Sequence, residues 1–175
     1  MLLDGYWKKD LKSIIKQLEF WSKRPFLFSQ RFAEHQINKG VLCSAVIIRK
    51  IIEDEKDVKP FFDECSESEK YLKTLFYDVP VVKYNHVGDG DLFINSKVII
   101  EDYDTKNAEK ETVHLSMVCN QLIHSYVWSL IYCYNGKRIF GFMVASDNLK
   151  EKEALFIKID DWINVIHFVI DNAII

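Results

Sequence analysis

Asn120 and His124 are the two residues whose types and spacing best fit a chemical role. They are four positions apart, so in an α-helix their side chains lie on one face and can act on one ligand. A histidine titrates near neutral pH and can transfer a proton, and an asparagine amide can hold a phosphate by hydrogen bonds. We therefore take Asn120 and His124 as the candidate catalytic residues. The alternative is structural: His124 bonds a backbone carbonyl, and Asn120 caps or braces it.

A helix predicted over residues 29–54 carries a stripe of polar side chains that forms a candidate binding surface: Arg31, His35, Asn38 and Arg49. The two arginines are eighteen residues apart, which is five full helical turns, and the other two residues lie within about 40° of the same line. An arginine of this stripe would complete a site with His124. The alternative is that both arginines border the solvent face, with Arg49 paired to Glu53 one turn later.

Metal and cofactor sites have little support in the sequence. Acidic residues gather in one stretch, at Asp89, Asp91, Glu101, Asp102 and Asp104. Oxygen ligands on a loop suit Ca²⁺ or Mg²⁺, but the residues after Asp89 depart from the Ca²⁺-loop pattern, because the fifth residue after it is Ile94 and no glutamate stands at the closing position. We predict a turn and a solvated loop here. Because no glycine-rich phosphate loop occurs either, we expect no metal site and no cofactor.

The run from Asn120 to His124 is similar to part of a known motif. Helical HEPN domains, found in many toxin and antiviral-defence ribonucleases, carry an arginine shortly before a histidine, commonly in the pattern R-N-x-x-x-H. The segment NQLIH of this chain resembles the last five positions of that pattern. The resemblance implies a bundle of antiparallel helices, pairing of two copies, and metal-independent RNA cleavage in which His124 is the acid–base residue and Asn120 positions the phosphate.

The chain departs from this motif at the position of its arginine, which is Cys119 here. The family's arginine would stabilise the charge that develops on the phosphate. A thiol cannot do so, because it has no fixed positive charge and no fork of donors. The resemblance therefore implies either a degenerate site without activity or a cation supplied from elsewhere, by Arg49 or Arg31.

Apolar periodicity and capping residues predict helices in the first half of the chain. Hydrophobic residues at three-and-four spacing give one apolar stripe over 6–21 and a longer one over 29–54. Gly40, inside the second, either bends the helix or lets a neighbouring helix come close. A capping box at Ser66 predicts a short third helix that ends before Pro80.

Two further helices are expected in the second half. Thr112 or Ser116 would begin the first of them, with Thr112 and His114 as capping residues. Asp160 or Asp161 would cap the final helix. The apolar side of that helix is formed by Trp162, Val165, Ile166, Val169 and Ile170.

Segments rich in β-branched residues predict strands between these helices. They cover residues 79–84, 92–100, 126–134, 137–145 and 154–159. The first two segments, separated by glycine and aspartate, predict a loose hairpin or an extended insertion, and the polar run 101–111 predicts a solvated loop. Asn135-Gly136 predicts a tight hairpin, because both residues tolerate positive φ.

The order of these elements predicts an α+β fold: an N-terminal antiparallel helical bundle, a small C-terminal antiparallel β-meander and a final helix. We expect one domain over residues 1–175. Its parts are a mainly helical region 1–77, an extended insertion or hairpin 78–111, a helix 112–125, a β-meander 126–159 and a helix 160–172.

The composition is that of a globular protein and excludes several function classes. Of 175 residues, 49% are hydrophobic and 14% aromatic, which favours a well-packed core and a self-association surface. A net charge of −3 argues against a dedicated DNA-binding protein. Free cysteines without paired spacing, the lack of an export signal, and the lack of a long uncharged apolar run predict a cytoplasmic protein with no membrane partner.

Two functions of different classes agree with the sequence. The first is a non-catalytic interaction or regulatory protein with a degenerate HEPN-like core, for which a protein partner or a homodimer is expected and a defence or toxin system would be a suitable setting. The second is a metal-independent endoribonuclease that uses His124 and Asn120 with a substitute arginine, and its partner would be RNA. The missing motif arginine and the near-neutral charge favour the first, so we lean against an enzyme.

Overall fold

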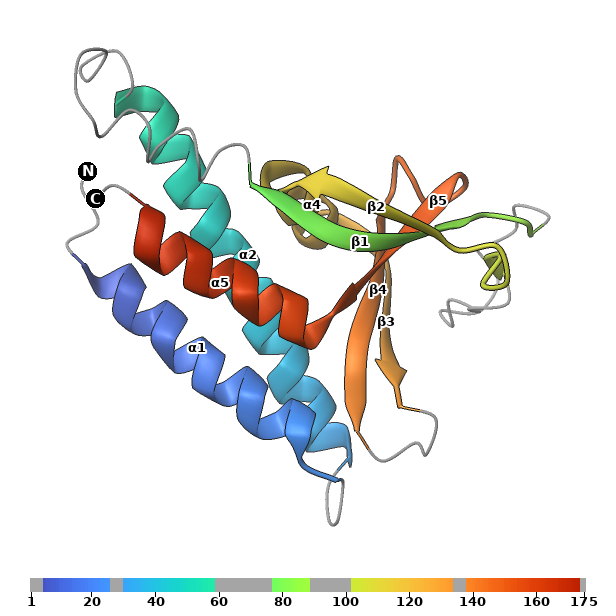
Figure 1. Ribbon diagram of the computed structural model, residues 1–175, viewed down its shortest axis with the longest axis horizontal. Coiled ribbons are helices and arrows are strands. Elements are labelled where there is room, and N and C mark those ends of the chain that lie inside the picture. Colours follow the sequence, from blue (N-terminus) through green and yellow to red (C-terminus); the bar gives the residue numbers. More distant parts are fainter. Residues whose placement is uncertain (1–4, 26–29, 59–76, 89–101, 134–137, 174–175) are drawn as a thin grey trace.

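The computed structural model describes residues 5–25, 30–58, 77–88, 102–133 and 138–173 of the chain. In chain order the elements are α1 (Tyr6–Lys23), α2 (Gln30–Val58), β1 (Asp78–Asn85), β2 (Glu109–His114), α4 (Leu115–Ile123), β3 (Ser125–Tyr132), β4 (Ile139–Ser146), β5 (Glu153–Lys158) and α5 (Ile159–Asn172). Figure 1 shows α1, α2 and α5 side by side, with the strands extending away from them. The predicted α+β class is confirmed.

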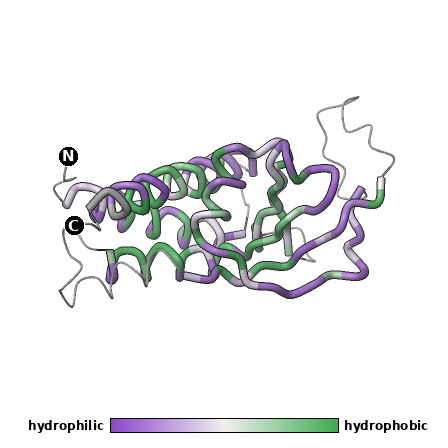
Figure 2. The backbone as a smooth tube through the Cα atoms, turned by 90° about the horizontal axis from the view of Figure 1, so that it is seen from above, coloured by the Kyte–Doolittle hydropathy of each residue, from purple (hydrophilic) through white to green (hydrophobic). Residues whose placement is uncertain are grey.

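The two N-terminal helices form where the sequence predicts them, because each has one apolar side. In α1 the buried side consists of the residues at three-and-four spacing, Trp7, Leu11, Ile14, Ile15 and Leu18. Figure 2 shows the resulting alternation of hydrophobic and hydrophilic stretches along the helices. A Cβ atom on Gly40 would lie only 2.8 Å from Leu18 Cδ2, so this glycine allows α1 and α2 to approach closely, as one of its two predicted roles requires.

The five strands of the described residues join one antiparallel sheet in the order β2-β1-β5-β4-β3. The three predicted strands of the meander are present as β3, β4 and β5. β1 is not part of a separate insertion, because it lies between β2 and β5 and is hydrogen-bonded to both. The sheet is therefore larger than the expected meander.

The region around β2 corrects two expectations. The predicted solvated loop over 101–111 ends early, since Glu109 already pairs with Lys83 of β1. The fourth helix begins at Leu115, and Thr112 belongs to the strand. His114 makes no side-chain cap on α4, and its Nδ1 instead lies 2.8 Å from Asp78 Oδ1.

The final helix follows β5 without a loop. α5 begins at Ile159, and neither Asp160 nor Asp161 caps it by a side-chain hydrogen bond; both lie in its first turn, where the helix dipole favours negative charge. Its predicted apolar side is buried as expected. The buried Trp162 Nε1 donates a hydrogen bond of 2.9 Å to Ser44 Oγ, which joins α5 to α2.

One large hydrophobic cluster connects the helices with one face of the sheet. It includes Leu18 of α1, Ile48 of α2, Val81 of β1, Phe142 of β4 and Trp162 of α5. A smaller cluster on the opposite face of the sheet contains Val127, Met143 and Tyr103. The helical layer and the sheet are thus held by a shared core.

Four sequence-based expectations lie outside the described residues: the helix after Ser66, the turn at Asp89 and Asp91, the strand over 92–100 and the Asn135-Gly136 turn. Within the described ranges, no helix has both the length and the apolar character needed to cross a bilayer.

Candidate functional site

The candidate catalytic residues lie on the outer side of α4. This short helix connects β2 to β3, which hold it in place. Its inner side is buried, and Gln121 fixes it further by accepting a hydrogen bond of 2.8 Å from the backbone N–H of Ser146. Asn120 is half-buried and His124 is exposed. The structure therefore brings Asn120 and His124 to one exposed surface.

His124 is the residue at which α4 ends. Its backbone N–H donates to the Asn120 carbonyl at 3.0 Å, which closes the last turn. For neither side chain is a hydrogen bond to another described residue found, so the proposed bracing of His124 by the Asn120 amide is absent from this part of the chain. An exposed imidazole beside an amide can bind an anion or exchange a proton with it.

Cys119, at the position of the motif's arginine, points into the core instead of toward that surface. It has no exposed area and belongs to the large hydrophobic cluster. Burial raises the pKa of its thiol to about 12, although the nearby positive charge of Arg49 acts in the opposite direction. The thiol is protonated at neutral pH, so it is neither a nucleophile nor an electrostatic substitute for arginine.

Arg49 is the arginine whose charge acts on α4, and it is already held by a carboxylate. Its Nε donates to Glu53 Oε1 at 2.8 Å, and its side chain is 28% exposed. The alternative predicted for this residue, an ion pair at i+4 on the border of the solvent face, is confirmed. Glu53 thus neutralises part of the positive charge of Arg49, which a phosphate bound at His124 would need.

The other members of the predicted stripe do not share one site with Arg49. Eighteen residues of helix span about 27 Å, so Arg31, at the N-terminal end of α2, lies far from Arg49, which stands about two-thirds of the way along the helix. Arg31 and His35 are exposed. Asn38 has a structural partner, because its Oδ1 accepts a hydrogen bond of 3.0 Å from Trp128 Nε1 of β3.

No pattern in the sequence indicates how α2 contacts β3. Besides the Asn38–Trp128 bond, the hydroxyl of Tyr132 donates to Glu34 Oε1. Burial, followed by this hydrogen bond to a carboxylate, raises the pKa of Tyr132 to about 12. These contacts join residues about ninety positions apart, and no local pattern predicts such pairs.

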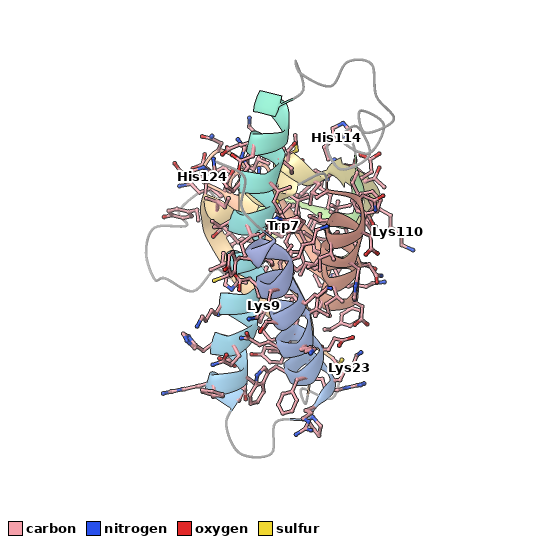
Figure 3. The ribbon with its side chains drawn as sticks, turned by 90° about the vertical axis from the view of Figure 1, so that its left-hand side faces the viewer. Trp7, Lys9, Lys23, Lys110, His114 and His124 are labelled. Carbon is pink, nitrogen blue, oxygen red and sulfur yellow. The ribbon has the colours of Figure 1, made fainter. Side chains whose placement is uncertain are left out.

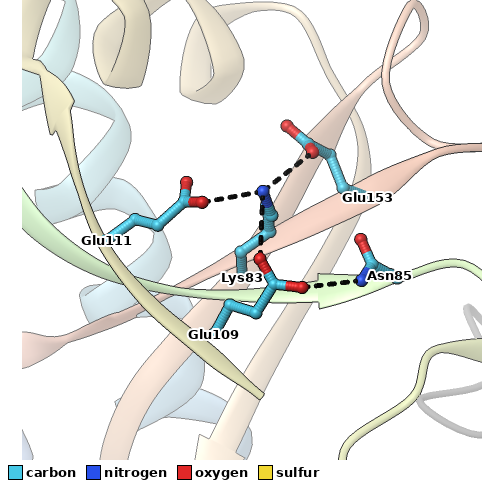
Figure 4. Close-up of polar contacts among 5 residues, drawn as sticks. All are labelled: Lys83, Asn85, Glu109, Glu111 and Glu153. Atoms are coloured by element: carbon cyan, nitrogen blue, oxygen red, sulfur yellow. Dashed lines mark hydrogen bonds and ion pairs between the residues drawn. The ribbon is translucent and has the colours of Figure 1, made fainter. Parts of the chain in front are cut away.

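A cluster of charged residues on β1, β2 and β5 was also not predicted from the sequence. Lys83 of β1 lies among three carboxylates, at 2.8 Å from Glu111, 3.5 Å from Glu109 and 3.9 Å from Glu153 (Figure 4). The side-chain hydrogen bond to Glu111 is the main cause of the raised pKa of Lys83. The ammonium group occupies the centre of these oxygens, so the cluster is an internal ion-pair network.

Asp104, one of the acidic residues of the predicted cluster, acts as a turn residue. Asp104 accepts hydrogen bonds from the backbone N–H groups of Lys106 and Asn107 and from the Asn107 amide, and these bonds lower the pKa of its carboxyl. Among the described residues, no three histidine, cysteine or acidic side chains are placed to hold a metal ion.

His124, at the C-terminal end of α4, lies apart from the charged residues at the start of β2. In Figure 3, His124 and Lys110 lie on opposite sides of the molecule. The site therefore consists of His124, Asn120 and the flank of α2 near Arg49. Comparison of the chain with protein-family models, with curated proteins and with solved structures finds no match.

Proposed function

We propose that this protein is a non-catalytic interaction or regulatory protein with a degenerate HEPN-like helical core, and that it acts in the cytoplasm. A defence or toxin system is the setting that the resemblance suggests. Its partner is another protein or a second copy of the chain.

Two observations together carry this proposal: Cys119 is buried, and Arg49, whose charge acts on it, is ion-paired. Cleavage of RNA through a 2′-hydroxyl needs a cation to stabilise the charge that develops on the phosphate. Cys119 is buried and neutral, and Arg49 is ion-paired with Glu53. Among the described residues, the arginine whose charge acts on α4 is thus already paired, beside the half-buried Asn120 and the exposed His124.

One observation favours the endoribonuclease as a second candidate. The charge of Arg49 acts on Cys119, so this guanidinium lies beside α4 even though it comes from another helix. Release of Arg49 from Glu53 by a bound phosphate would supply the missing cation to His124 and Asn120. In that case His124 would transfer the proton and Asn120 would position the phosphate.

Cleavage of labelled single-stranded RNA and transfer RNA in EDTA distinguishes these functions. We expect the wild type and His124→Ala to give the same background, because the interaction protein has no catalytic step. His167→Ala is the matched control, since His167 is an exposed histidine on α5. Cleavage by the wild type that is lost in His124→Ala and in Arg49→Ala but kept in His167→Ala would overturn the proposal and establish the ribonuclease.

A further inference from the structure

The two outer strands of the sheet differ sharply in how they are protected against pairing with other chains. β2, at one edge, contains Glu109, Lys110 and Glu111, and five of its six residues are exposed. Charged side chains on an edge strand discourage pairing with a second strand. β3, at the other edge, has the sequence SYVWSLIY, with no charged residue and no proline.

The central part of β3 is regular strand with a partner on one side. Val127 to Ile131 pair in continuous register with Ala145 to Gly141 of β4, and the register shifts occur only at the two ends of this stretch. Among the described strands, β4 is the single neighbour of β3. Alternate backbone N–H and C=O groups of Val127–Ile131 therefore point away from β4, where they can form a further ladder.

Exposed apolar side chains border this edge. Trp128 of β3 is bonded to Asn38 of α2, and Leu42 and Val46 follow one and two turns after Asn38. Leu42 is 36% and Val46 54% exposed. Ile123, which is 37% exposed, stands two residues before β3 begins. The strand edge and the flank of α2 thus present one apolar surface.

We propose that β3 pairs antiparallel with β3 of a second copy about a two-fold axis, so that the two sheets become continuous across a homodimer. This inference rests on the proposed interaction function, for which it names the partner and the surface. The axis runs perpendicular to the sheet, so both helical layers lie on the same face and the two α2 flanks meet beside the joined strands.

The chemistry of the strand favours a second copy as its occupant. Antiparallel pairing of an uncharged strand with itself places no like charges opposite each other, and the same patch serves both partners. Pairing of β3 with β2 of another copy would set Glu109, Lys110 and Glu111 against apolar residues, and this head-to-tail contact would build an open filament. A stable interface needs about 800 Å² per partner, which the α2 flank and Ile123 help to supply.

A charge-swap experiment tests the interface. Ser129 lies at the centre of the continuous stretch of β3 and is half-buried, so Ser129→Lys or Ser129→Glu places like charges near the two-fold axis. Light scattering after size exclusion should give about 41 kDa for the wild type, twice the 20.6 kDa of the chain. Each variant alone should give the monomer mass, and an equal mixture of the two should return to about 41 kDa. Thr112→Lys, on the exposed β2 edge, is the matched control and should remain dimeric.

Hydrogen exchange of the wild type provides a second measurement that needs no variant. Between about 5 and about 200 µM, amides of β3 should become more protected as the dimer forms, and amides of β2 should not change. A wild type that stays monomeric over this range, single variants that remain dimeric, or a dimer disrupted by Thr112→Lys would each overturn the inference.

The outcomes for the two proposals are separable. A monomer that does not cleave RNA would remove the β3 interface and leave the interaction function. A dimer that cleaves RNA through His124 would keep the interface and remove the interaction function.

Discussion

Cys119 determines what the end of α4 can do. Its side chain fills space in the shared core, so the position cannot present a charged group to a ligand beside His124. The pattern R-N-x-x-x-H requires the opposite, an arginine that reaches the surface. The helix is therefore oriented so that Cys119 is buried, Asn120 is half-buried and His124 is exposed.

We expect Cys119→Arg to unfold the protein rather than to restore a catalytic motif. The new guanidinium would be buried without a partner and close to the like charge of Arg49, which costs about 3–5 kcal/mol or more. Circular dichroism and urea unfolding would show a loss of structure or a large drop in the midpoint.

Cys119→Ala is the control for the loss of the thiol itself, and we expect it to remain folded. A Cys119→Arg protein with the unfolding midpoint of the wild type would contradict the expected burial.

Single residues were predicted only where their partners are close in sequence. The Arg49–Glu53 pair follows from i+4 spacing on one helix and is confirmed. The partner of Asn38 is ninety residues away in β3, so the helical pattern could place Asn38 on a face but not identify what lies against it. The same pattern placed Arg31 and Arg49 on one line, but their separation by five turns, about 27 Å of helix, keeps them from sharing one site.

Elements with a strong apolar period were predictable, and β2 was not. Its sequence, Glu109 to His114, alternates weakly and carries charges, which is typical of a loop. It is a strand because an edge position needs hydrogen bonds on one side only and tolerates charged residues. The start of α4 was misplaced for the same reason, since the residues before Leu115 belong to β2.

The Lys83 network makes the attachment of β2 dependent on pH. The pKa of Lys83 is raised in the folded state, so its contribution to stability is fully present below the ordinary lysine value of 10.5 and is lost as the pH rises through the higher folded value. We expect Lys83→Met to lower the unfolding midpoint by a constant amount between about pH 7 and pH 9. Above about pH 10.5 the difference from the wild type should shrink.

Urea unfolding across this pH range measures the difference. Lys110→Met, which removes the same charge from an exposed position on β2, is the control and should have a smaller effect. A deficit of Lys83→Met that grows above pH 10.5 would disagree with the raised pKa.

At the scale of the whole molecule, the helices and the sheet share one core, and this sharing should make unfolding cooperative. Side chains from α1, α2, α4 and α5 pack with those from β1, β4 and β5 in a single cluster. A layer that detached would expose a large part of that apolar surface to water. The two layers therefore stabilise each other.

We expect urea transitions followed by far-ultraviolet circular dichroism and by tryptophan fluorescence to coincide. The dichroism reports mainly on the helices, while the fluorescence comes from both layers: from Trp7 and Trp21 in α1, Trp162 in α5 and Trp128 in β3. Two separate midpoints would mean that the sheet and the helical layer unfold independently.

The fold class could be predicted from the sequence, but the strand order could not. Helix and strand periods are local, and together they give α+β. The two neighbours of β1 in the sheet, β2 and β5, lie far along the chain, whereas the sequence predicted a loose hairpin with the segment that follows β1, or an extended insertion. Long-range pairing of this kind leaves no local signature.

The interior position of β1 has a consequence for the order in which the chain folds during synthesis. The α1–α2 hairpin can form as soon as both helices have left the ribosome, because its contacts are local. β1 follows directly in the described structure, yet its partners emerge about thirty and seventy residues later. Among the described strands, neither edge of β1 has a partner until β2 emerges, and one edge waits for β5. The nascent chain thus passes through a stage in which a chaperone that binds extended apolar segments would protect it from aggregation.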